Sequence, residues 1–124
     1  MSYDVKWHKA NKVLYVTYAG KLSAEDIEQA NQKVLDVLEK ADTAIHALVN
    51  VTGMNEVAFT LQEVMQSKVV GEVSGHANLG WVIYFDKDNA YYNFLASIVG
   101  QNFGERVKFV NTEAEAIDFV NTRL

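Results

Sequence analysis

The chain has 124 residues, a length typical of one domain and too short for two domains of ordinary size. Its 11 Lys and Arg residues against 16 Asp and Glu residues give a formal net charge of −5. This charge disfavours nucleic acids and anionic membrane surfaces as partners, because both attract cationic proteins. Cys is absent, which excludes disulfides, thiolate metal sites and a cysteine nucleophile.

The sequence carries no signal for export or membrane insertion. Its first residues lack the apolar core of a secretory signal. The longest apolar runs, such as residues 81–85, are far shorter than the roughly 20 residues that cross a bilayer. We therefore expect a cytoplasmic protein without a membrane span.

An antiparallel hairpin is predicted at the start of the chain. Residues 4–7 and 13–18 alternate between apolar and polar side chains, the pattern of half-buried strands. Asn11, between them, takes the left-handed turn conformation easily, and Gly20 is expected to end the second strand.

The first predicted helix begins after Ser23 and runs to about Lys40. Ser23 can cap the first turn, and Asp26 lies favourably at the positive end of the helix dipole. One face carries apolar residues at helical spacing, namely Ile27, Ala30, Val34, Leu35 and Leu38.

A strand over residues 44–51 follows, with side chains buried on both faces. Residues 53–56 are predicted to form a loop. The next helix is expected to begin with a capping box of Thr60 and Glu63 and to end at Gly71. Its predicted apolar stripe is Leu61, Val64, Met65 and Val69. Residues 71–80, with three glycines, are predicted to be the loosest segment.

The last part of the chain predicts two more strands and two more helices. Residues 81–85 are wholly apolar, as in a central parallel strand. Asp86, Asp88 and Asn89 are N-cap candidates for a helix that carries Tyr91, Phe94, Leu95, Ile98 and Val99. A strand over residues 106–110 precedes a helix capped by Thr112, with Ile117, Val120 and Leu124 facing inward.

This order of elements predicts one α/β domain over residues 1–124. Strands that alternate with helices imply parallel strands joined by right-handed crossovers. We expect a single-layer mixed five-stranded sheet, with an opening antiparallel hairpin and then parallel β-α units, packed with about four helices.

Several segments resemble the SpoIIAA-like family. They are the strand and cap of residues 13–26, the strand ends at residues 48–53 and 81–84, and the closing residues 106–120. These are small bacterial domains related to STAS anti-sigma-factor antagonists and, more remotely, to CRAL-TRIO lipid-transfer domains. The resemblance implies a SpoIIAA-like fold and a regulatory role through protein contacts.

The antagonists of that group carry an Asp-Ser-Ser-Gly-like stretch after the third strand, where a partner kinase phosphorylates one serine. Residues 57–61 of this chain contain neither the Asp nor the serine pair. Thr60 is the only hydroxyl residue near that place, and we interpret it as a helix N-cap. The resemblance therefore implies the fold of these antagonists without their phospho-acceptor motif.

The residues point to no cofactor, metal ion or catalytic group. His8, His46 and His76 have no metal-ligand spacing. His46 is interpreted as a buried, hydrogen-bonded imidazole, whereas His76 is the more attractive candidate because loops carry function. Carboxylates near the predicted strand ends are ordinary helix-start residues, and no nucleophile motif accompanies them. We therefore predict a protein that is not an enzyme.

The predicted function is a non-enzymatic protein-interaction or regulatory module. Adjacent tyrosines in a helix cannot both face inward, so one of Tyr91 and Tyr92 should be exposed and favours a partner surface or a homo-dimer. The alternative is a small apolar-ligand or lipid-binding domain lined by aromatic residues. The predicted contacts involve the loops at residues 53–60 and 71–80 and exposed aromatics. The candidate surface residues are Asn50, Thr52, Gly53, Thr60, His76, Trp81, Tyr91 and Tyr92.

Overall fold

The computed structural model describes residues 2–86 and 106–124. Its elements in chain order are β1 (Tyr3–Lys9), β2 (Val13–Ser23), α1 (Ala24–Lys40), β3 (Ile45–Ala58), α2 (Leu61–Met65), α3 (Lys68–Ser74), β4 (Leu79–Phe85), β5 (Val107–Val110) and α5 (Glu113–Asn121). None of the helices in the described part is both long enough and apolar enough to cross a membrane.

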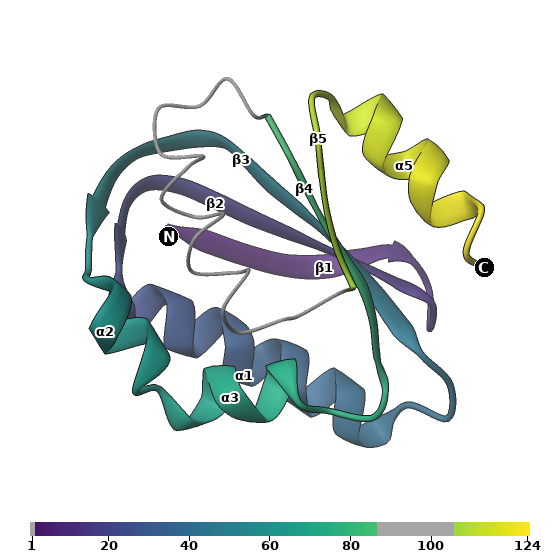
Figure 1. Ribbon diagram of the computed structural model, residues 1–124, viewed down its shortest axis with the longest axis horizontal. Helices are drawn as coiled ribbons and strands as arrows, with labels where there is room; N and C mark the ends of the chain where they lie inside the picture. The colour runs from purple at the N-terminus through teal and green to yellow at the C-terminus, as the bar shows by residue number, and fades with distance from the viewer. Residues whose placement is uncertain (1, 87–105) are drawn as a thin grey trace.

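The five strands form one mixed sheet in the order β1-β2-β3-β4-β5. β1 is antiparallel to β2, and the other three neighbouring pairs are parallel. The predicted α/β class, the opening hairpin and the parallel β-α units are therefore confirmed. Figure 1 shows α1, α2 and α3 along one face of the sheet and α5 across the other.

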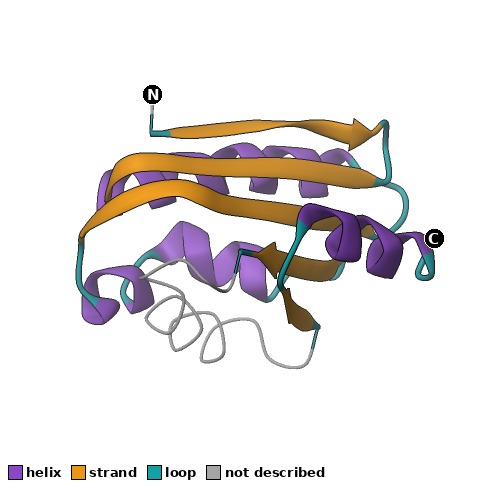
Figure 2. Cartoon of the chain, turned by 90° about the horizontal axis from the view of Figure 1, so that it is seen from above, coloured by secondary structure: helices purple, strands orange, loops and turns teal. Residues whose placement is uncertain are grey.

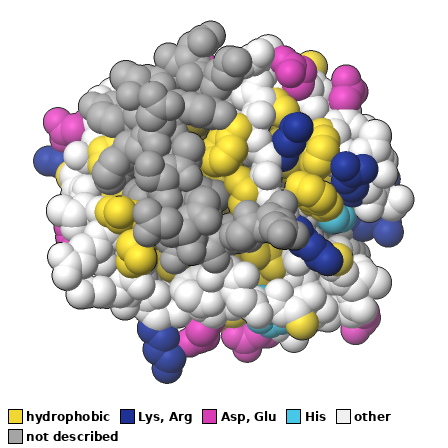
Figure 3. Space-filling model, viewed as in Figure 1, with side chains coloured by type: hydrophobic (Ala, Val, Ile, Leu, Met, Phe, Trp, Pro, Cys, Tyr) yellow, Lys and Arg dark blue, Asp and Glu magenta, His cyan; other side chains and the backbone are white. Residues whose placement is uncertain are grey.

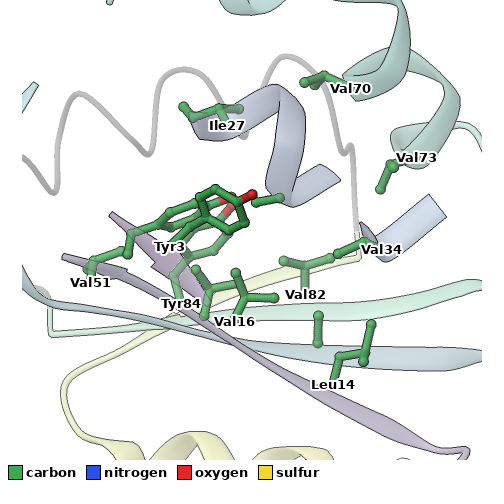
Figure 4. Close-up of a cluster of buried hydrophobic side chains, with 14 of the residues drawn as sticks. Tyr3, Leu14, Val16, Ile27, Val34, Val51, Val70, Val73, Val82 and Tyr84 are labelled. Carbon is green, nitrogen blue, oxygen red and sulfur yellow. The ribbon is translucent and has the colours of Figure 1, made fainter. Parts of the chain in front are cut away.

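The larger core lies between the sheet and the face that α1, α2 and α3 cover. In Figure 4, Val16, Val82 and Tyr84 from the strands point toward Ile27 and Val34 of α1. The smaller core lies under α5, where Leu48, Ile83, Phe85, Ala116 and Val120 pack together. Alternate residues of β3 enter the two cores, which confirms that this strand is buried on both faces.

β2 and β3 extend beyond their predicted ends, so two predictions are wrong. Gly20 does not end β2: with φ at +67°, it takes a left-handed conformation inside the strand, which continues to Ser23. Residues 53–56 form no loop, because they belong to β3 and pair with the extended part of β2. The register shifts after Thr17 and after Gly20, and each shift places one extra residue on β3.

The single helix predicted from Thr60 to Gly71 is also wrong, because the structure divides this segment into α2 and α3. The side chain of Ser67 accepts a hydrogen bond from the Val70 amide and starts a new helix. Met65 is 50% exposed instead of facing the core. Gly71 lies within α3, which runs on to Ser74 through the segment that the glycines predicted to be loose.

The predicted N-caps Ser23, Thr60 and Thr112 are confirmed. Ser23 forms a reciprocal capping box with Asp26, as Thr60 does with Glu63. The Thr112 side chain accepts from the Glu115 amide at the start of α5. Leu124 does not face inward as predicted: it is 47% exposed, because α5 ends at Asn121. The helix predicted to carry Tyr91, Phe94, Leu95, Ile98 and Val99 lies outside the described residues.

Candidate functional site

Among the described helices, only α5 packs on its face of the sheet, and it covers that face in part. Helix α5 packs on β3, β4 and β5, and Figure 2 shows β1 and much of β2 with no described helix in front of them. The register places polar side chains of three neighbouring strands together here, since Lys6 lies opposite Tyr15 and Thr17 lies beside Asn50. We call the following residues the open polar surface: Lys6, His8, Tyr15, Thr17, Asn50 and Glu113. They line a shallow depression of about 490 Å³, with Trp7 at its margin.

A chain of hydrogen bonds fixes the centre of this surface. The Tyr15 hydroxyl donates to Glu113 Oε2 at 2.7 Å and accepts from Asn50 Nδ2 at 3.1 Å. Asn50 Oδ1 in turn accepts from the Thr52 amide at 2.9 Å and from the Thr52 hydroxyl at 2.6 Å. Side chains of β2, β3 and α5 are thereby held in one orientation at the surface.

The bend in β3 explains why Asn50 occupies this place. The first extra residue of β3 lies between Asn50 and Gly53, where the pairing with β2 shifts. Asn50 Oδ1 accepts the Thr52 N–H two residues later, as the side chain does in an Asx turn. Asn50 therefore supports the bulge and presents its amide nitrogen to Tyr15.

The Tyr15 hydroxyl keeps its proton at neutral pH. Burial, together with the hydrogen bond to Glu113, raises the pKa of Tyr15 to about 12, although the Asn50 hydrogen bond acts in the opposite direction. Lys6 Nζ lies 5.6 Å from the centre of the Tyr15 ring, and the His8 ring centre lies 6.4 Å from it. The surface thus presents a protonated phenol flanked by basic side chains and one carboxylate.

The predicted surface residues do not form one cluster. Asn50 and Thr52 lie together in the hydrogen-bond chain described above, with Gly53 next to them on β3. Gly53 lies against the neighbouring strand, since a Cβ atom built on it would be 3.2 Å from the Ala19 Cβ. Tyr91 and Tyr92 lie outside the described residues.

Thr60 has a structural role at the start of α2. Its side chain accepts from the Glu63 amide at 3.2 Å, and its own amide donates to the Glu63 carboxylate at 3.0 Å. The interpretation of Thr60 as an N-cap is therefore confirmed.

His76 supports the turn between α3 and β4. Its Nδ1 atom accepts from the Asn78 amide at 3.0 Å. The Asn78 side chain donates to the carbonyls of Leu38 and Ala41, at the end of α1. His76 therefore orders the turn from which Asn78 caps the carboxyl end of α1.

His46 and Trp81 are joined at an irregularity in the sheet. The register between β3 and β4 shifts after Ile45, and the backbone amide of Trp81 donates to His46 Nδ1 at 2.8 Å. Burial lowers the pKa of His46, with a smaller contribution from Arg106. The buried, hydrogen-bonded imidazole predicted from the sequence is confirmed. Gly80 leaves room for this ring, because a Cβ atom there would clash with His46 Nδ1.

Trp81 is partly covered by the end of the chain. Its ring meets Phe119 edge-on, with 5.1 Å between centres, and the Arg123 guanidinium lies 5.2 Å from its centre. Figure 3 shows basic side chains among hydrophobic ones on the side of the molecule where α5 lies. Within the described ranges, no three His, Asp or Glu side chains are close enough to hold a metal ion.

An apolar cavity of about 70 Å³ lies on the other side of the sheet. It is bounded by strand residues such as Val16, Val49 and Tyr84 and by residues of α1, α2 and α3 such as Val34, Val64 and Val73. Of the aromatic residues that the apolar-ligand prediction placed around a pocket, Tyr84 lines this cavity, whereas Trp81 and Phe85 belong to the core under α5.

Of the six residues that form the open polar surface, the sequence analysis named only Asn50 as a candidate for the interaction surface. It considered His8 only as a metal ligand. It did not name Lys6, Tyr15, Thr17 and Glu113 as functional candidates. The alternation of β2 placed Tyr15 and Thr17 on the face opposite Leu14 and Val16, which was a usable signal. No signal linked them to Glu113, which is 98 residues from Tyr15 in the chain.

The comparisons with known proteins concern the fold. No family model matches the sequence, and no curated protein matches it significantly. One similar solved structure is that of an uncharacterized protein of the DUF3478 family with a SpoIIAA-like fold, from Shewanella loihica PV-4. Its sequence is 18% identical to this chain, and the TM-score is 0.64 over 95% of this chain and 91% of that chain. The Bacillus cell fate determinant SpoIIAA, in its phosphorylated form, is 18% identical with a TM-score of 0.57, over 95% of this chain and 98% of that chain. Together with the sheet order and the helix positions, these similarities establish that the chain has the SpoIIAA-like α/β fold.

Proposed function

We propose that this chain is a non-enzymatic protein-interaction module and that its partner binds the open polar surface. The observation that carries this proposal is the hydrogen-bond chain that fixes Tyr15, Asn50 and Glu113 on a sheet face without a described covering helix. Side chains that are already ordered lose little entropy on binding. Tyrosine is also among the residues that contribute most to the energy of protein interfaces.

The electrostatics favour binding over acid–base catalysis. Tyr15 is protonated at neutral pH, so its hydroxyl can form hydrogen bonds but cannot act as a general base. His46 has a lowered pKa, but it is buried and its Nδ1 is occupied by the Trp81 amide. Neither group is both accessible and poised to exchange a proton near pH 7.

The SpoIIAA-like fold supports a role in protein contacts, whereas the residues at the start of α2 do not support regulation by phosphorylation there. SpoIIAA was solved in its phosphorylated form. In this chain the Thr60 hydroxyl lies 3.2 Å from the Glu63 carboxylate, so a phosphate on Thr60 would meet a negative charge. We therefore place the interaction on the open polar surface of a cytoplasmic protein instead of at the start of α2.

Affinity capture from cells that express the protein tests the proposal. The bait variants are Tyr15→Phe and Asn50→Ala, each compared with the unchanged chain by quantitative mass spectrometry. Met65→Ala is the matched control, because Met65 is exposed on α2, away from this surface. We expect a partner that the unchanged chain and Met65→Ala retain and that both surface variants lose.

Two results would contradict the proposal. Recovery of no partner, together with a strictly monomeric sedimentation profile, would argue against an interaction module altogether. A partner lost with Met65→Ala and kept with Tyr15→Phe would move the interface to α2.

A second candidate function is the binding of a small apolar ligand in the cavity between the sheet and α1. The cavity of about 70 Å³ is less than half the size of an engineered apolar cavity of roughly 150 Å³ that binds benzene. This size supports a very small ligand and gives no support to a lipid chain. Native mass spectrometry of the purified protein tests it, since a bound ligand would add mass to the chain.

A further inference from the structure

The outer edge of β1 is available for pairing with another strand. Among the described residues only β2 pairs with β1, and Figure 2 shows β1 at the margin of the sheet. The Ala19 amide donates to the Ser2 carbonyl at 2.9 Å, so Ser2 directs its backbone groups toward β2. Because backbone direction alternates along a strand, Asp4 and Lys6 also face β2. The backbone N–H and C=O groups of Tyr3, Val5 and Trp7 therefore face outward.

The sequence of this edge is complementary to itself when it runs antiparallel. If Val5 lies opposite the partner's Val5, then Tyr3 lies opposite the partner's Trp7 and Asp4 lies opposite the partner's Lys6. All three outward-facing residues then fall in hydrogen-bonded pairs, each exchanging two N–H···O bonds. Asp4 and the partner's Lys6 form a non-hydrogen-bonded pair, in which the side chains are closer, and opposite charges in such a pair stabilise a sheet.

The neighbouring registers are unfavourable because they bring like charges together. A register centred on Asp4 places this carboxylate opposite the partner's Asp4. A register centred on Lys6 places this ammonium opposite the partner's Lys6. Like charges directly opposite each other destabilise paired strands, so the charges select the register centred on Val5.

We propose that two copies of this chain associate through antiparallel pairing of their β1 strands about Val5. The two sheets then form one continuous sheet with a twofold axis perpendicular to it. Trp7, which is 41% exposed in the single chain, lies opposite the partner's Tyr3. Both open polar surfaces lie on the same side of the joined sheet, so a dimeric partner could bind both at once. This inference does not depend on the proposed function.

Charge reversal tests the pairing directly, by sedimentation equilibrium over a range of protein concentrations. Asp4→Lys leaves two basic residues on the edge, and Lys6→Asp leaves two acidic residues. Both side chains are exposed, so each variant should fold, which circular dichroism can verify. We expect each variant to dimerise at least about tenfold more weakly than the unchanged chain, because both attractions become repulsions.

An equal mixture of Asp4→Lys and Lys6→Asp provides the sharper result. Each basic edge then meets an acidic edge, so the two variants should form a heterodimer more strongly than either variant dimerises with itself. Lys12→Asp is the control, since it changes a charge by the same amount in the turn outside β1. It should dimerise as the unchanged chain does.

Three outcomes would overturn the inference. One is an unchanged chain that remains monomeric at all concentrations, which would mean that Lys6 protects the edge against pairing. The others are charge-reversal variants that dimerise normally and a mixture that forms no heterodimer. Capture of a partner by Tyr15 and Asn50 is a separate measurement, so either proposal can fail alone.

Discussion

The Tyr15 hydroxyl donates a 2.7 Å hydrogen bond to Glu113 and thereby joins β2 to the first turn of α5. The two residues are 98 positions apart in the sequence. The contact ties the start of α5 to the sheet, next to the part of that face over which no described helix lies. It is therefore both a tertiary constraint and the centre of the candidate surface.

Stability should fall at alkaline pH in a way that depends on this pair. The pKa of Tyr15 is raised from 10.0 to about 12, so between these values the unfolded chain loses a proton that the folded chain keeps. The free energy of unfolding should therefore decrease as pH rises through this window. Urea unfolding at pH 8 and pH 11 measures it. Tyr15→Phe should make the decrease smaller without abolishing it, because burial also raises the pKa values of Tyr18 and Tyr84.

Glu113→Gln should lower the pKa of Tyr15 without returning it to 10. Burial is the largest cause of the raised pKa and remains in the variant, whereas the hydrogen bond to the carboxylate and its charge are lost. Ultraviolet titration of tyrosinate on the unchanged chain and the variant measures this shift. Burial also raises the pKa values of Tyr18 and Tyr84, so both spectra contain those late-titrating groups. Identical titrations would show that Glu113 does not act on Tyr15 in solution.

The Thr60 cap should contribute measurably to stability. Thr60→Ala removes the acceptor of the Glu63 amide, and we expect a loss of about 1 kcal/mol in the free energy of unfolding. Thr60→Ser keeps the hydroxyl and should retain most of the stability. Chemical denaturation of the two variants tests this. Equal stability of Thr60→Ala and the unchanged chain would mean that the cap is dispensable.

Two glycines should respond in opposite directions to replacement by alanine. In Gly80→Ala the new Cβ would clash with the His46 ring, so the ring or the backbone beside it must shift, at about 1–3 kcal/mol. In Gly71→Ala the new methyl meets open space inside α3, where alanine is favoured by up to about 1 kcal/mol. Melting temperatures of the two variants should therefore move apart. A loss in Gly71→Ala as large as in Gly80→Ala would contradict this packing.

His46 should make the fold sensitive to acid. Its pKa is lowered from 6.5 by burial, so below this pH the unfolded chain binds a proton that the folded chain excludes. The contribution to stability is therefore present above pH 6.5 and decreases as pH falls below it. Unfolding at pH 7 and pH 5 measures the effect. His46→Gln should show a smaller difference between the two conditions, and an unchanged difference would assign the acid sensitivity to other groups.

Local patterns predicted much of the secondary structure because they depend on neighbouring residues. The hydroxyl of Ser23 lies three residues from Asp26, and that spacing by itself sets a helix start. The apolar run at residues 81–85 likewise indicated a buried strand. The prediction failed where a distant segment overrode the local signal. Gly20 and Gly53 suggested breaks, but pairing between β2 and β3 carries both strands past them.

The sequence by itself determined the α/β class, the antiparallel first strand and the residues that start the helices, because periodicity and capping act within a few positions. Only the tertiary structure decided that α5 covers part of one sheet face and that Tyr15, Asn50 and Glu113 meet beside it. That arrangement depends on the β3 bulge and on where α5 packs. Both result from contacts between segments that are far apart in the chain, and no local pattern encodes them.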